Sequence, residues 1–97
     1  MSMKEAYSQA QKWMSEFAKK SPEKMQAFQK MVEAIEKEEG ESLDKKTKEL
    51  IAVALSIARD CEWCIAFHVK EAINEGASED EILEAAWMAI LMGGRLI

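Results

Sequence analysis

Apolar residues recur at steps of three and four along most of this 97-residue chain, and this period constrains its fold more than any other feature. One apolar stripe runs from Met3 to Ala18, and a second runs from Met25 to Ile35. No segment alternates apolar and polar residues at period two, so we expect no β-sheet. Only four glycines and one proline interrupt the chain. The pattern predicts an all-α fold of about five helices.

Capping signals indicate where these helices begin. Residues 21–23, Ser-Pro-Glu, supply an N-cap, a first-turn proline and a first-turn acid for the second helix. The apolar period is lost over residues 36–42, which we interpret as a linker. Asp44 is the expected N-cap of the third helix, and Asp60 that of a fourth helix starting at or beside Cys61. A Ser-Glu-Asp-Glu capping box at residues 78–81 starts the fifth.

The length of the chain predicts a single domain over residues 1–97. We expect N-terminal helices over residues 1–38 and a core over residues 43–97. Residues 50–58 are apolar on nearly every side, with only Ser56 interrupting them. Such a helix has to be buried all round or pack against another subunit. Because so short a chain builds only a modest core of its own, association between copies is expected.

Charge excludes several classes of partner. Thirteen Lys and Arg against eighteen Asp and Glu give a net charge of −5, which leaves no basic face for nucleic acid. The N-terminus meets charged residues at once, and no apolar run is long enough to cross a bilayer, so we expect no signal peptide, no membrane contact and a cytoplasmic location. In a reducing compartment, two cysteines three positions apart are typical of catalytic or metal-binding pairs.

Cys61, Cys64 and His68 form the candidate site, because their spacing places all three on one stripe of a helix. The amino end of a helix stabilises a thiolate, so these cysteines are expected to be nucleophilic near neutral pH. His68 follows Cys64 by one turn, where it can take or return the thiol proton. A short connection to the preceding helix would bring Glu49 close enough to orient His68, directly or through water. This redox interpretation needs no cofactor.

The residues alone leave alternatives open. Cys61 and Cys64 together with His68 and Glu49 also make a four-ligand zinc set. A further alternative, which the His68 spacing and the helix start at Cys61 disfavour, is that the two cysteines are small buried hydrophobes. Aromatic side chains near the motif, at Trp63 and Phe67, are interpreted as core or subunit interface rather than as a substrate wall.

The segment from Glu49 to His68 contains, in order, a Glu, eleven residues, C-x-x-C, three residues and a His. This segment resembles the alkylhydroperoxidase AhpD-like branch of the carboxymuconolactone decarboxylase family, whose signature has the same residues at the same spacing. The resemblance extends from about Leu43 to Gly93 and Gly94, about half of the chain. The best-studied peroxidases of the family carry a second His inside the C-x-x-C, where this chain has Trp63.

The resemblance implies an enzyme, a thiol-dependent peroxidase or disulfide oxidoreductase. It implies that Cys64 attacks the peroxide, that Cys61 resolves the sulfenic acid as a disulfide, and that Glu49 and His68 relay protons. The substrate would be a hydroperoxide or a disulfide, and a lipoamide-like or thioredoxin-like thiol would supply the electrons. The family's fold is built around a helical hairpin and assembles as homo-trimers or homo-hexamers. Lactone decarboxylation, which gives the family its name, is a further alternative.

Overall fold

The computed structural model describes residues 2–93, and all regular secondary structure in this part of the chain is helical. Its helices are α1 (Met3–Lys20), α2 (Pro22–Glu36), α3 (Lys45–Ala58), α4 (Glu62–Asn74) and α5 (Glu79–Met92). The all-α prediction is confirmed. Residues 1 and 94–97 of the predicted domain, including Gly94 of the family resemblance, lie outside the described residues.

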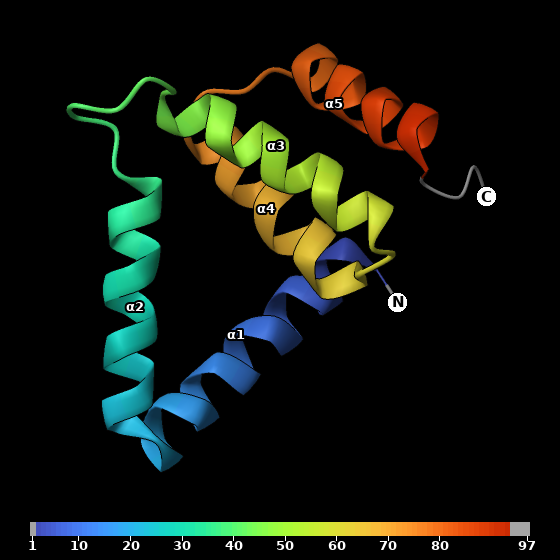
Figure 1. Cartoon of the computed structure of the whole chain (residues 1–97). Coiled ribbons are helices and arrows are strands. Elements are labelled where there is room, and N and C mark those ends of the chain that lie inside the picture. Colours follow the sequence, from blue (N-terminus) through green and yellow to red (C-terminus); the bar gives the residue numbers. More distant parts are fainter. Residues whose placement is uncertain (1, 94–97) are drawn as a thin grey trace.

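The hairpin of α3 and α4 forms the centre of the molecule, as the resemblance predicted (Figure 1). α5 packs along α3, and α1 packs against α4, so each helix of the hairpin has a second neighbour. Small side chains at the contacts let the backbones approach closely: Ala6 of α1, Val53 of α3 and Ala72 of α4 are fully buried. None of the helices within residues 2–93 has the length and apolarity that a bilayer crossing requires.

α2 stands apart from this core. It contacts α1, with which it forms a V that opens toward the α3–α4 hairpin (Figure 1), and none of its residues is buried. Its carboxyl end is tied to α3 by Lys48, whose Nζ donates hydrogen bonds to the carbonyl oxygens of Ile35 and Lys37, each at 2.8 Å. These bonds satisfy two carbonyls that the end of a helix leaves without a partner. Lys48 therefore fixes where α2 ends.

The start of α4 differs from the sequence prediction by one residue. Cys61, not Asp60, is the N-cap, because the Cys61 Sγ accepts a hydrogen bond from the backbone N–H of Cys64 at 3.3 Å. Asp60 lies in the preceding turn with a φ of 56°, a left-handed conformation that short polar side chains tolerate better than most. The turn from α3 into α4 thus makes a cysteine the cap.

Large apolar side chains of α3 and α5 remain exposed within one chain. Leu55 of α3 is 59% exposed, and Trp87 and Leu91 of α5 are 62% and 74% exposed. Of the two alternatives predicted for the third helix, burial on all sides does not hold within a single copy, and packing against another subunit stays a prediction. Large apolar side chains exposed on two neighbouring helices are typical of interfaces between proteins.

Candidate active site

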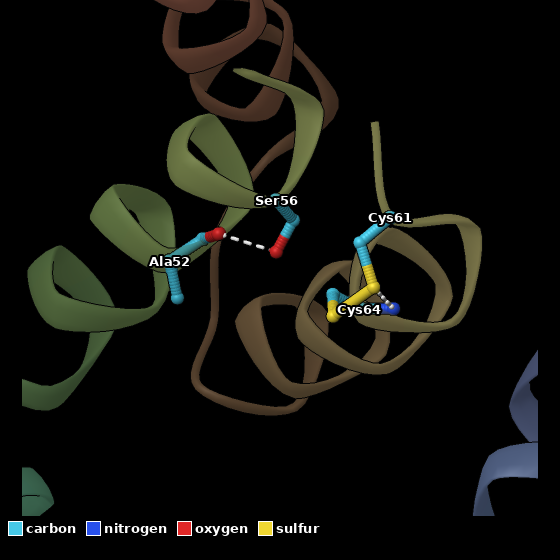
Figure 2. The surroundings of a disulfide bond; sticks show 4 residues. All are labelled: Ala52, Ser56, Cys61 and Cys64. Carbon is cyan, nitrogen blue, oxygen red and sulfur yellow. Dashed lines mark hydrogen bonds between the residues drawn. A yellow bond between two sulfur atoms is a disulfide. The ribbon is translucent and has the colours of Figure 1, made fainter. Parts of the chain in front are cut away.

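Cys61 and Cys64 are joined by a disulfide at the amino end of α4 (Figure 2). Their Cα atoms lie 5.2 Å apart, within the ordinary range for a disulfide. Because Cys61 is the N-cap and Cys64 lies in the first turn, both sulfurs sit at the positive end of the helix dipole. The site is thus built so that a thiolate formed on reduction is stabilised by its position in the helix.

Ser56 of α3 supports this end of α4 from the other side of the turn. The carbonyl oxygen of Ser56 accepts a hydrogen bond from the backbone N–H of Cys61 at 3.1 Å. Its buried hydroxyl donates to the carbonyl oxygen of Ala52 at 2.6 Å, as Figure 2 shows beside the disulfide. In the sequence, Ser56 only interrupts an apolar run. In the structure, its carbonyl oxygen holds the backbone of Cys61 at the start of α4.

Glu49 and His68 are brought into direct contact by the α3–α4 hairpin. The Oε2 atom of Glu49 lies 2.9 Å from Nδ1 of His68, and Glu49 is only 2% exposed. A buried carboxylate requires such a partner. Since an ionised carboxylate only accepts hydrogen bonds, Nδ1 carries the proton and Nε2 is the ring nitrogen that can accept another. The pair therefore has the chemistry of an oriented general base.

Cys64 and His68 line one large cleft, which has a volume of about 920 Å³ and lies between α1, α2 and α4. Cys61 is not among the residues that line it. Most of the cleft wall is apolar and much of it is aromatic, with Trp13, Phe17, Phe28, Trp63 and Phe67 contributing. One of the two sulfurs is therefore next to the open volume, together with the imidazole.

Trp63 and Phe67 pack on α1, but neither is fully buried within one chain, so they are not core residues of a single copy. The indole N–H of Trp63 donates to Oε1 of Gln9 at 3.1 Å, and the ring of Phe67 stacks on that of Tyr7 at 5.9 Å between centroids. Both residues also line the cleft, which the sequence interpretation did not anticipate. They line the cleft from the α4 side.

Glu36, the last residue of α2, is a site residue that the sequence analysis missed. It lines the cleft with His68 and Glu71. Partial burial raises the pKa of Glu36 above its usual 4.5, as do the charges of Glu49 and Glu71, while His68 and Lys45 act in the opposite direction. The available signal was an acid in the last turn of a helix, where the dipole disfavours negative charge. The sequence pattern instead predicts a linker that starts at this position.

The structure gives the zinc alternative no support. Both cysteines are held in the disulfide, and among residues 2–93 no group of three or more His, Cys, Asp or Glu side chains is arranged to hold a metal ion. Of the four ligands proposed from the sequence, Glu49 and His68 have side chains that are hydrogen-bonded to each other.

Residues 22–95 match the sequence model of the carboxymuconolactone decarboxylase family. The chain belongs to this family. A family protein from Legionella pneumophila, crystallised in its apo form, superposes with a TM-score of 0.87 and is 38% identical, covering 95% of this chain and 80% of that one. Another family protein, from Thermotoga maritima, is described as a candidate for the antioxidative response. It superposes with a TM-score of 0.75 at 30% identity, covering 93% of this family member and 75% of that chain.

Three bacterial relatives carry names that assign them no function. One, in the cox locus of Paracoccus denitrificans, is 53% identical over 51 residues. The others, from Cupriavidus necator and Haemophilus influenzae, are 37% identical over 73 residues and 42% identical over 69. The matched parts of this family member span 46%, 63% and 59% of the lengths of these relatives.

The Glu49–His68 contact predicts that removal of the imidazole destabilises the wild type more than a variant without the Glu49 carboxylate. His68→Ala should lower the free energy of unfolding by about 1 to 3 kcal/mol more in the wild-type background than in a Glu49→Gln background, because only the wild type is left with a buried carboxylate without its partner. Urea denaturation of the four proteins of this cycle measures the difference. Equal costs in both backgrounds would contradict the argument.

The raised pKa of Glu36 predicts a pH-dependent stability. A raised folded-state pKa contributes stability below the unfolded value of 4.5, and this contribution is lost as the pH rises through the folded-state pKa. Glu36→Gln should therefore be more stable than the wild type at pH 7, and this advantage should vanish below pH 4.5. Urea denaturation at both pH values measures it. Glu33→Gln, an exposed change on the same helix, is the matched control and should show no such dependence.

Proposed function

We propose that this chain is a thiol-dependent oxidoreductase of the alkylhydroperoxidase type, whose Cys61–Cys64 pair cycles between dithiol and disulfide. The observation that carries the proposal is the placement of Cys64 in one cleft with His68, whose ring is oriented by the buried Glu49. A nucleophilic sulfur, a base and a group that orients the base are the components such chemistry requires. The disulfide beside this cleft is the expected oxidised product.

In the proposed cycle His68 accepts the proton of the Cys64 thiol. The thiolate attacks one oxygen of a hydroperoxide, the O–O bond breaks, and the proton passes to the departing alkoxide as an alcohol forms. Cys61 then attacks the Cys64 sulfenic acid, forming the disulfide and releasing water. The dithiol has lost two electrons and the peroxide has gained them. A lipoamide-like or thioredoxin-like dithiol reduces the disulfide and completes the turnover.

The cleft supports the proposed division of labour between the cysteines. Cys64 lines the open volume and Cys61 does not, so a substrate in the cleft meets Cys64 first. The apolar and aromatic walls favour an alkyl or aryl hydroperoxide, or an apolar disulfide, over a small hydrophilic oxidant. The Thermotoga maritima neighbour, as a candidate for the antioxidative response, is consistent with a peroxide substrate.

The exposed apolar side chains favour assembly. Within one chain α3 and α5 leave Leu55, Trp87 and Leu91 more than half exposed, and covering them would remove a large apolar area from water. We propose a homo-trimer or homo-hexamer built through these helices. The cytoplasm is the compartment we propose for it, because a reducing thiol pool there returns the disulfide to the dithiol.

Thiol counting and intact mass before and after one equivalent of cumene hydroperoxide test this function. The reduced wild type should lose two thiols and the mass of two hydrogen atoms. Cys61→Ser should instead gain one oxygen atom at Cys64, because no resolving thiol remains. Cys64→Ser should show neither the loss of thiols nor the gain of oxygen. Wild-type protein that keeps both thiols free would contradict the proposal. Lactone turnover that survives loss of both thiols would favour the decarboxylase alternative.

A further inference from the structure

The carboxyl end of α2 brings a third acid to the cleft beside the Glu49–His68 pair. Glu36 lies on a helix that is otherwise remote from the hairpin, yet it shares the cleft with His68 and Glu71. Its surroundings are charged from two sides: Lys45 and Glu49 act on it from α3, and His68 and Glu71 act on it from α4. Helix α2 buries no residue of its own, so the site depends on whatever holds this end of α2 in place.

Lys48 of α3 bonds the backbone at this end of α2, and the backbone N–H of Lys45 adds a longer bond to Oε1 of Glu38 at 3.4 Å. The Lys48 ammonium group bonds the carbonyl oxygens of Ile35 and Lys37, the two residues that flank Glu36 in the chain, and also contacts Oε1 of Glu41 at 3.2 Å. Lys48 directly precedes Glu49 on α3. One short segment of α3 therefore carries both the acid that orients His68 and the cation that fixes the backbone on either side of Glu36.

We propose that Glu36 tunes the proton affinity of His68 from the cleft side, and that Lys48 positions Glu36 to do so. The inference rests on the proposed function, in which His68 becomes a cation each time it accepts the Cys64 proton. An ionised Glu36 stabilises that cation by Coulomb attraction, and a protonated Glu36 does not. Glu36 acts through His68 and not on the substrate, so it is a positioning residue.

Retention of an acid at this position has a cost that supports the assignment. The charges of Glu49 and Glu71 raise the pKa of Glu36, and Glu36 stands where the helix dipole disfavours a negative charge. A neutral side chain would avoid both penalties. Charges kept at the expense of stability are typical of functional sites.

His68 is the only histidine in the chain, so its ring signals give an unambiguous NMR titration. The test uses the oxidised full chain without substrate. The titration curve of the His68 ring should move to lower pH in Glu36→Gln by roughly 0.5 to 1 pH unit, because one nearby negative charge is lost. Glu33→Gln makes the same change on an exposed position of α2 and should move the curve much less. A shift in Glu36→Gln no larger than in Glu33→Gln would overturn the proposal.

A double-mutant cycle tests the role of Lys48. In a Lys48→Met background, Glu36→Gln should move the His68 curve by less than half of its shift in the wild-type background, because Glu36 is no longer held at the cleft. Lys48→Gln serves in its place if the methionine variant does not fold. The full shift in the Lys48 variant would overturn the positioning role.

The NMR readout is independent of turnover, so the two proposals fail separately. A protein that forms no disulfide with cumene hydroperoxide but shows the Glu36-dependent shift contradicts the peroxidase function and supports the coupling. A protein that reacts with the peroxide but shows no shift contradicts the coupling alone. In a reactive protein, Glu36→Gln should also move the acid-side fall of the rate of disulfide formation to lower pH, together with the titration of His68, which a purely structural residue would not do.

Discussion

The hydrogen bond between Glu49 and His68 is the interaction on which the site depends. It spans the central hairpin, so it is formed only when α3 and α4 pack in register. It also gives a hydrogen-bond partner to the one acidic side chain that is buried among the described residues. Once His68 is fixed in this way, the spacing along α4 places Cys64 on the same face and in the same cleft. The same hydrogen bond therefore joins the two central helices and orients the imidazole beside Cys64.

Much of the fold could be predicted because its signals are local. Three-and-four periodicity, the first-turn proline at Pro22 and the capping box that starts at Ser78 each determine a helix from neighbouring residues, and the structure begins α2 and α5 there. Motif spacing likewise brought out Cys61, Cys64 and His68, since residues on one helix face can be read from sequence alone. The family match adds independent support for the fold.

The rest could not be predicted because it depends on how separate helices meet. Glu36 belongs to the site only because the α1–α2 V returns the chain to the hairpin, and nothing local to residues 36–42 specifies that return. Nothing in the sequence distinguishes Lys48 from Lys45 and Lys46, which also precede Glu49. Its bonds to the end of α2 exist only in the folded chain. The cap of α4 was misplaced by one residue because Asp60 is the better cap by propensity, whereas the turn geometry gives that position to Cys61.

The central claim is that an oriented imidazole activates Cys64, and the rate of disulfide formation after mixing reduced protein with cumene hydroperoxide tests it most directly. Glu49→Gln keeps the size of the side chain and its ability to accept a hydrogen bond but removes the charge that supports a protonated His68. The account predicts that this variant forms the disulfide at least about tenfold more slowly than the wild type near neutral pH. Equal rates in the two proteins would contradict it.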